Sequence, residues 1–118
     1  TAKGKFKSKG RSAKEINQLM KDALLLQNSG VFAIVLECVK VSSAKQITQQ
    51  LKIPTIGIGS SVHCDGQVLV TDDLIGLNNI NFRFVKKFTD IRKYINLGIK
   101  KFSLEVKSKK YPTKKHSY

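Results

Sequence analysis

Long apolar stretches are missing from this 118-residue sequence, in which no run approaches the roughly 18 residues that a membrane-spanning helix needs. The first eleven residues are basic and polar, and no apolar segment follows them as it would in a secretory signal peptide. We therefore expect a cytoplasmic protein with no membrane partner. Because the chain begins with Thr and not with Met, we also expect residues upstream of it.

Cysteine and histidine are scarce, with two residues of each. Cys38 and Cys64 form no CxxC motif, and no histidine pair stands at zinc spacing, so the sequence predicts neither a zinc site nor a disulfide. We expect Cys38 to be a small core residue and Cys64 to be a free thiol near a loop. Nothing resembles a Ser-His-Asp constellation, and His63 and His116 stand in polar contexts where we expect them to be exposed.

Acidic residues are also few. The sequence has 8 Asp and Glu and 22 Lys and Arg, which gives a net charge of +14. This charge suits a nucleic-acid-binding module, in which clustered cations neutralise phosphates. However, no helix-turn-helix, zinc finger or RNP-like aromatic motif accompanies the basic residues, and 19 of the 22 are Lys. Lys suits a solvated surface better than bidentate phosphate recognition. We favour the solvated surface and keep nucleic-acid binding as the alternative.

The composition is that of one globular core, with 41% hydrophobic and 25% charged residues. Ser12 and Glu15 form a capping box ahead of apolar residues at helical spacing, which predicts a helix from about residue 13 to 28, closed by Gly30.

Strands and helices are then predicted to alternate. The stretch "FAIVLECV", Phe32–Val39, is short, apolar and β-branched, which indicates a strand, and Ser42 or Ser43 is placed to cap a second helix. Further strands are predicted at "TIGIGS", Thr55–Ser60, and at "QVLV", Gln67–Val70. This order indicates parallel βα units.

The last third is predicted to be helical. Thr89 precedes apolar residues at helical spacing from Ile91 to Val106, which indicates an amphipathic helix packed on a sheet. We expect residues 107–118 to be an extended basic tail and residues 1–11 to be a loop. Three parallel strands with both faces covered imply a larger sheet, either doubly wound or a (β/α)8 barrel. A barrel needs roughly 250 residues, so on that interpretation the chain supplies about half of one.

Glu37 is the candidate catalytic residue because it is the one acid in an apolar strand. Burial of an unpaired carboxylate costs several kcal/mol, so a chain that keeps one either pairs it or uses it. Side chains alternate along a strand, which places Phe32, Ile34, Leu36 and Cys38 on a helix-covered face and Ala33, Val35, Glu37 and Val39 on the other. Near the carboxyl end of a barrel strand, Glu37 suits a general base. The alternative is a structural Glu paired with a Lys or Arg of a neighbouring strand.

Other motifs carry weaker signals. The "GIGS" turn, Gly57–Ser60, suits a phosphate cradle, although glycines at this spacing are also typical of close packing. Asp65, Asp72 and Asp73 have oxygen ligands that a metal accepts, but no spacing defines a site, and helix capping or turn formation is the favoured interpretation.

Several motifs together resemble the ketopantoate hydroxymethyltransferase family. "FKSKGR", "FAIVLECV", "AKQIT", "IPTIGIGS", "CDGQVLV", "DLIGL", "FVKKF" and "YPTKKHSY" follow one another at that family's spacing and cover essentially the whole chain. The resemblance implies that residues 1–118 are the carboxyl-terminal half of a single (β/α)8 barrel, with strands six to eight and their helices.

The resemblance also implies an activity. In that family the carboxylate of the "LEC" segment is the proposed catalytic base, which assigns this role to Glu37. The implied reaction of pantothenate and coenzyme A biosynthesis transfers a hydroxymethyl group from 5,10-methylenetetrahydrofolate to 3-methyl-2-oxobutanoate, giving 2-dehydropantoate. The resemblance places the Mg²⁺ ligands on the absent amino half, so we expect that half as a partner and the isolated chain to be inactive. It also implies a homo-oligomer, commonly a decamer.

The chain departs from the family pattern in two loops. The family's "GIGAG" reads "GIGSS" here, with Ser60 and Ser61, and Asp72 stands where relatives usually carry a His before Asp73. Two competing hypotheses therefore stay open beside the transferase: a basic nucleic-acid-binding module, and a non-catalytic assembly subunit built on a barrel segment.

Overall fold

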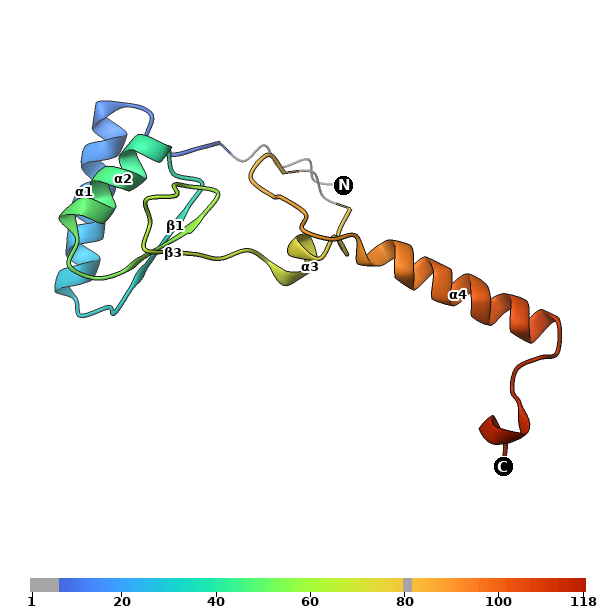
Figure 1. The fold of residues 1–118 in the computed structure, drawn as a ribbon. Coiled ribbons are helices and arrows are strands. Elements are labelled where there is room, and N and C mark those ends of the chain that lie inside the picture. Colours follow the sequence, from blue (N-terminus) through green and yellow to red (C-terminus); the bar gives the residue numbers. More distant parts are fainter. Residues whose placement is uncertain (1–6, 80–81) are drawn as a thin grey trace. The chain divides into compact units, whose positions relative to one another are not determined.

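The computed structural model describes residues 7–79 and 82–118 (Figure 1). The chain divides into two compact units. We call residues 7–70 with 82–85 the strand unit, and residues 71–79 with 86–118 the helix unit. The expected loop at residues 1–11 is described only from Lys7 onward, and residues 1–6 lie outside the described residues.

Helix α1 spans Ala13–Asn28, as the capping box predicts. The Ser12 hydroxyl accepts a hydrogen bond from the Glu15 backbone N–H at 3.2 Å, and the Glu15 carboxylate accepts one from the Arg11 backbone N–H at 2.8 Å. The Arg11 N–H holds the pKa of the Glu15 carboxyl below its ordinary value, because it stabilises the charged form. The helix ends where Gly30, at φ 89°, turns the chain toward the first strand.

The sheet has three parallel strands in the order β1-β2-β3, as the sequence predicts. Strand β1 spans Ile34–Glu37 and β2 spans Thr55–Ile58, with Ile34 opposite Thr55 and Glu37 opposite Ile58. Strand β3 is only Gly66–Gln67, so the strand predicted from Gln67 to Val70 is shorter and begins one residue earlier.

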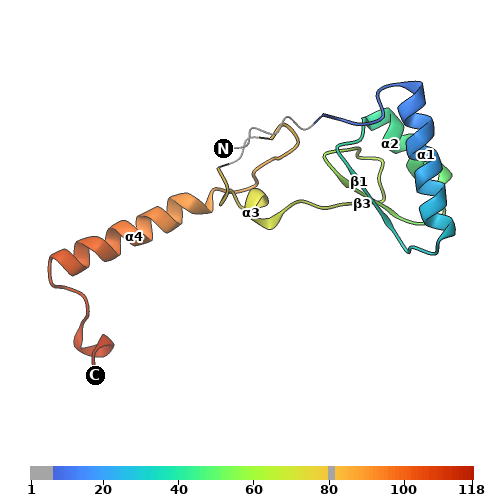
Figure 2. The same cartoon turned by 180° about the vertical axis from the view of Figure 1, so that it is seen from behind.

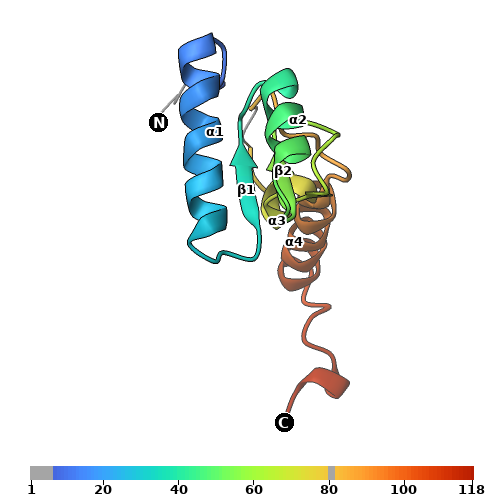
Figure 3. The same cartoon turned by 90° about the vertical axis from the view of Figure 1, so that its left-hand side faces the viewer.

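The core of the strand unit lies between the sheet and the two helices (Figure 3). Helix α2 spans Val41–Gln50 and lies beside α1 in both opposed views (Figures 1 and 2). Ile47 of α2 is fully buried, and burial of such a side chain contributes roughly 1.5–3 kcal/mol. The buried apolar cluster comprises Ala23, Ile34, Leu36, Val39, Ala44, Ile47 and Cys64. Both helices therefore cover the sheet face that carries Ile34 and Leu36.

The opposite face of β1 is open within the described chain. Val35 is 60% exposed, and Glu37 is exposed as well. The covering of both faces was expected of a larger sheet than these residues form, and it stays a prediction. Phe32, placed in the strand by its sequence, lies before β1 and is 89% exposed.

The predicted alternation of side chains breaks after Glu37. Cys38 adopts φ 53°, which turns the chain, and both Cys38 and Val39 are buried. The turn lets Lys9 pair with Val39 in a parallel bridge, in which the Lys9 N–H donates to the Cys38 carbonyl oxygen at 2.9 Å. Val39 therefore packs in the helix-side core rather than sharing the face of Glu37.

The start of α2 also differs from the prediction. Lys40 is the residue that precedes the helix, and its side chain forms no capping hydrogen bond. Ser43 lies inside the first turn, fully buried, and its hydroxyl donates to the Gly10 carbonyl oxygen at 2.7 Å. The serine predicted as a cap instead ties the segment before α1 to α2.

The helix unit contains α3, Thr71–Leu74, and α4, Ile91–Lys107, followed by a 3-10 turn, Lys114–His116. Asp90 precedes α4 without a side-chain capping bond, so the predicted cap at Thr89 is wrong. No residue of α4 is buried, and Phe102 is 56% exposed, so the predicted packing of α4 on a sheet stays a prediction. The 3-10 turn interrupts the tail that we expected to be extended.

Among residues 7–79 and 82–118, none of the helices has the length and apolar character to cross a membrane.

Candidate functional site

Glu37 is the last residue of β1, at the carboxyl end of the sheet. Its neighbour in the register is Ile58, the last residue of β2. Its side chain shares the open face with Val35, opposite the face that the helices cover. Glu37 is exposed at this position, and it is not part of the buried apolar cluster.

The Glu37 carboxylate forms no hydrogen bond and no ion pair with any described residue. The structural alternative for Glu37, a salt bridge to a neighbouring strand, therefore has no partner in this part of the chain. Its charge acts on the next residue: burial raises the pKa of the Cys38 thiol, and the negative charge of Glu37 raises it further. Cys38 is thus held as a neutral thiol, which excludes it as a thiolate nucleophile at neutral pH.

Ser60 ties the loop after β2 to the end of β1. Its hydroxyl donates to the Leu36 carbonyl oxygen at 2.6 Å and accepts a hydrogen bond from the Val39 N–H at 3.0 Å. These two contacts bracket Glu37 and Cys38, so the backbone that carries the candidate base is held on both sides. Ser61 is 4% exposed, and its hydroxyl accepts a hydrogen bond from the His63 N–H at 3.2 Å.

Both glycines of "GIGS" lie where an added side chain would collide with a neighbour. A Cβ on Gly57 would lie 2.9 Å from Gln67 Oε1 and 3.2 Å from Cys64 Sγ, so Gly57 permits close packing of β2. Gly59 has φ 61°, and a Cβ there would lie 2.7 Å from Phe84. The close-packing interpretation is therefore confirmed at both glycines, and Gly59 also lines a cavity.

This cavity, of about 800 Å³, lies within the strand unit at the carboxyl ends of β1 and β2. Three cationic side chains line it, those of Arg11, Lys40 and Arg83, and none of its lining residues is Asp or Glu. Phe82 and Phe84 also line it, with ring centroids 5.7 Å apart and planes 1° from parallel.

Two of the three candidate aspartates, Asp65 and Asp73, accept hydrogen bonds with their carboxylates, and Asp72 accepts one with its backbone carbonyl oxygen. Asp65 Oδ2 accepts hydrogen bonds from the Thr55 N–H at 2.8 Å and the Thr55 hydroxyl at 3.0 Å, which hold the pKa of Asp65 below its ordinary value. Asp73 is buried and accepts a hydrogen bond from Asn78 at 2.9 Å. The Asp72 carbonyl oxygen accepts from the Leu77 N–H.

Within the part of the chain that the structure describes, no three His, Cys, Asp or Glu side chains gather into a group that could hold a metal ion. His63 and His116 are exposed, as predicted. Cys38 and Cys64 are both free thiols and both buried, which confirms the core position of Cys38.

A sequence profile described as ketopantoate hydroxymethyltransferase matches residues 1–114. The chain belongs to this family. It is 59% identical over 113 residues to the 3-methyl-2-oxobutanoate hydroxymethyltransferase of Pelagibacter ubique. The aligned residues cover 96% of this chain and 44% of that protein. It is 42% identical over 113 residues to the enzyme of the same name from Saccharolobus solfataricus, with 96% of this chain and 42% of that protein covered. The chain therefore spans less than half the length of the curated relatives that it matches.

The residues that differ from the family pattern can now be placed. Ser60 provides the two hydrogen bonds that hold the end of β1, and Ser61 closes a local turn. Asp72 lies in the helix unit, where its side chain is exposed. The first substitution thus has a structural reason, whereas nothing in the described chain explains the acid at residue 72.

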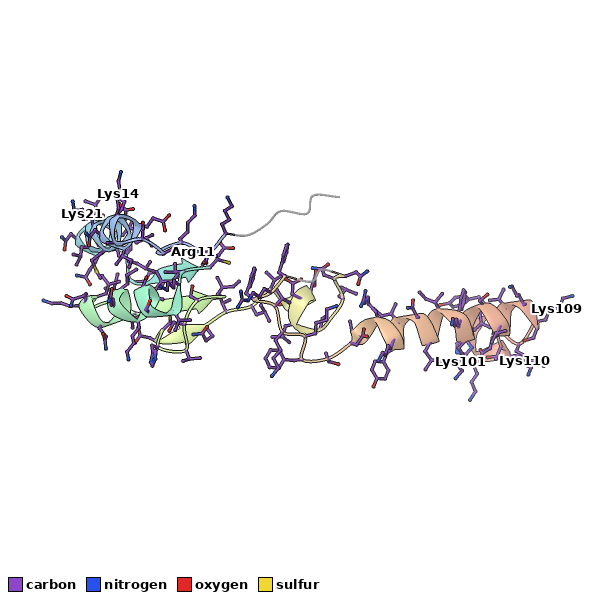
Figure 4. The ribbon with its side chains drawn as sticks, turned by 90° about the horizontal axis from the view of Figure 1, so that it is seen from above. Arg11, Lys14, Lys21, Lys101, Lys109 and Lys110 are labelled. Atoms are coloured by element: carbon purple, nitrogen blue, oxygen red, sulfur yellow. The ribbon has the colours of Figure 1, made fainter. Side chains whose placement is uncertain are left out.

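Arg11, Lys40 and Arg83 are all exposed, as the solvated-surface interpretation predicts, but sequence reasoning did not predict that the three line one cavity. A signal was present: Lys40 follows the end of β1 closely, where parallel strands direct their loops to one edge of the sheet. Figure 4 shows Arg11 before α1, whereas Lys14 and Lys21 project from that helix. Arg11 lines the cavity and these two lysines do not, because of where each residue lies in the fold and not because of the sequence around it.

Proposed function

We propose that this chain is the carboxyl-terminal part of a (β/α)8 barrel that transfers a hydroxymethyl group from 5,10-methylenetetrahydrofolate to 3-methyl-2-oxobutanoate, giving 2-dehydropantoate. Membership of the ketopantoate hydroxymethyltransferase family supports the reaction class. The names of the relatives support the keto acid as substrate.

The barrel is supported by how the sheet is covered. In a (β/α)8 barrel the helices form the outer ring, and the opposite face of each strand points inward. Helices α1 and α2 cover the Ile34 and Leu36 face, so Val35 and Glu37 would point into the barrel. The parallel bridge of Lys9 to Val39 supports a sheet that continues past β1, since it places a preceding segment at the free edge of that strand.

The observation that carries the proposal is the position of Glu37, which ends β1 on the helix-free face without a partner among the described residues. Active sites of (β/α)8 barrels open at this end of the strands. A free carboxylate there is available to remove a proton.

Glu37 would act as the general base. Its carboxylate takes the proton from C3 of the keto acid, and the electron pair of that C–H bond becomes the enolate. The one-carbon unit bonds to C3 and to a hydroxyl group from water, and its bonds to both folate nitrogens, N5 and N10, break. Two protons are released, one from C3 by way of Glu37 and one from water, and each goes to one of these nitrogens. The Glu37 carboxylate is thereby regenerated, and tetrahydrofolate is the second product.

A metal ion is implied by the family resemblance but is not accommodated by the described residues, among which no group of three or more ligands exists. We therefore derive no step through a metal from this chain. We propose that the Mg²⁺ ligands lie on the amino-terminal part of the barrel, which is also the partner that this chain requires for activity. A homo-oligomer of such barrels is part of the same proposal.

A chimera tests the proposed function directly. This chain replaces the segment that it matches in the Pelagibacter ubique relative, and the product is assayed with Mg²⁺, the keto acid and the folate. We expect 2-dehydropantoate from the chimera and none from the 118-residue chain alone. Folded chimera without product would contradict the proposal, and turnover by the isolated chain would contradict its dependence on the amino-terminal part.

A further inference from the structure

We propose that Ser60 is a positioning residue for the candidate base. Its hydroxyl fixes the backbone on both sides of Glu37 and thereby sets how fast that carboxylate removes a proton. This inference rests on the proposed function for the role of Glu37. It adds to that function a side chain of the loop after β2, which acts through the backbone of β1 and not on the substrate.

The geometry of the Ser60 hydroxyl is the first argument. It donates to the Leu36 carbonyl oxygen at 2.6 Å and accepts from the Val39 N–H at 3.0 Å, so it bonds the residue before Glu37 and the second residue after it. A hydroxyl has a single hydrogen to donate, and the bond to Leu36 uses it. Ser60 is also partly buried, which limits the access of water to both bonds. One side chain thus closes a bridge over the segment that carries the base.

The backbone that this bridge spans is strained. Cys38, the residue after Glu37, has φ 53°, a conformation that residues other than Gly rarely adopt. Such conformations persist only where surrounding contacts hold them, and they gather at functional sites. The Cys38 carbonyl oxygen is held by the Lys9 N–H at 2.9 Å, and the Val39 N–H that follows is held by Ser60. Loss of the Ser60 hydroxyl frees the chain just after Cys38, and the neighbouring Glu37 moves with it.

Glu37 depends on its backbone for position because its side chain has no partner of its own. Among the described residues, its carboxylate forms no hydrogen bond and no ion pair. A general base must come within roughly 2.6–3.2 Å of the atom whose proton it removes. A misplacement of about 1 Å can lower a rate about a hundred-fold. A contact that fixes the backbone beside Glu37 therefore acts on the rate of proton removal.

A purely structural role for Ser60 is the competing explanation, and a second substitution separates the two. The Thr48 hydroxyl lies 2.8 Å from the Thr55 hydroxyl, at the first residue of β2 and thus at the end of the sheet away from Glu37. Thr48→Val keeps the shape of the side chain and removes this contact. It should lower stability, as Ser60→Ala does, without reaching the backbone that carries the base.

Exchange of the C3 proton of the keto acid with deuterated solvent, in the chimera with Mg²⁺, tests the proposal at a temperature at which every variant is folded. Ser60→Ala should lower the maximal exchange rate by about three- to ten-fold, a part of the effect of a full misplacement, and leave the KM for the keto acid within about two-fold. Thr48→Val should leave both values unchanged. Ser60→Cys keeps the shape of the side chain but bonds more weakly, so its rate should lie between those of Ser60→Ala and the unmodified chimera.

A second measurement does not depend on activity. Amide hydrogen exchange of residues 36–41, followed by mass spectrometry, should be faster in Ser60→Ala than in Thr48→Val, because only the first substitution removes the acceptor of the Val39 N–H. If Ser60→Ala does not fold, Ser60→Cys takes its place in both measurements.

An unmodified rate of C3 exchange in Ser60→Ala would overturn the proposal, and so would an equal loss of rate in Thr48→Val. The two proposals fail in distinguishable ways. If Glu37→Gln slows the exchange and Ser60→Ala does not, the proposed function stands and only the positioning role is lost. If Glu37→Gln leaves the rate unchanged, the proposed base is wrong and the role of Ser60 is lost with it.

Discussion

The Ser60 hydroxyl lies 2.6 Å from the carbonyl oxygen of Leu36, so the loop after β2 is bonded to the strand that carries Glu37. The same hydroxyl receives the Val39 N–H at 3.0 Å. One side chain therefore bridges the point at which Cys38, with its positive φ, ends the regular strand pairing. The position of the candidate base depends on this loop as well as on the sheet.

Replacement of Ser60 by Ala should destabilise the strand unit. The variant leaves the Leu36 carbonyl and the Val39 N–H without this partner, and partly buried groups left unpaired cost about 1–3 kcal/mol. Urea unfolding followed by circular dichroism measures the loss. Ser42→Ala, an exposed serine in the first turn of α2, is the matched control and should change stability by less than about 0.5 kcal/mol. Equal losses in the two variants would contradict the role of Ser60.

Asp65 should make stability depend on pH in the acid range. Its pKa is lowered in the folded chain by the Thr55 backbone N–H and then by the Thr55 hydroxyl, so its contribution is complete above the ordinary Asp pKa of about 3.9. The contribution is lost as the pH falls through the lowered folded-state value. We therefore expect Asp65→Asn to be less stable than the unmodified chain at pH 7, with the difference shrinking below about pH 4.

Unfolding free energies of the two proteins between pH 7 and pH 3 provide the comparison. Asp22→Asn, on the exposed surface of α1, controls for the loss of one negative charge. A gap between Asp65→Asn and the unmodified chain that stays constant over this range would show that the Thr55 contact does not depend on the charge of Asp65.

Gly59 should not accept a side chain. Its φ of 61° disfavours other residues, and a Cβ would lie 2.7 Å from Phe84, a contact that forces the loop or the ring to move. Gly59→Ala should therefore lower the free energy of unfolding and change the cavity at the strand ends. Gly98→Ala, inside α4 with no atom within 4 Å of the added Cβ, should instead stabilise its helix by about 1 kcal/mol.

Thermal unfolding measures the stability of both glycine variants relative to the unmodified chain. The expected changes have opposite signs, which excludes a general effect of alanine. Stabilisation by Gly59→Ala would contradict the conformation of this loop.

Local signals in the sequence predicted the first part of the fold closely. The bounds of α1 follow from Ser12, Glu15 and Gly30, because capping and a left-handed terminal residue act within one turn of the helix. The parallel order of the three strands followed from the alternation of strand and helix patterns. These features depend on neighbours in the sequence.

Features set by distant contacts were not predictable. Ser43 was a candidate cap, but its hydroxyl bonds the Gly10 carbonyl oxygen, 33 residues away in the sequence. Cys38 has a backbone conformation that non-glycine residues rarely adopt, stabilised by pairing with Lys9, so strand alternation could not place Val39.

The candidate site was predicted only in part, because part of it depends on contacts between distant segments. Glu37 was identified because an acid inside an apolar strand is anomalous in sequence, and the structure places it at the strand end on the helix-free face. The cavity beside it combines Arg11, Lys40 and Arg83 from three separate segments, and no local pattern joins them. The apolar side of α4 predicted burial that the described chain does not provide.

The central claim is that Glu37 removes the C3 proton of the keto acid. Exchange of that proton with deuterated solvent, followed by NMR in the chimera without folate, isolates this step from the transfer. Glu37→Gln should slow the exchange by a factor of about a hundred to ten thousand, the usual contribution of a general base, while the chimera stays folded. Glu105→Gln, a matched change on α4, should exchange at the unmodified rate. Exchange that Glu37→Gln leaves as fast as in Glu105→Gln would contradict the account.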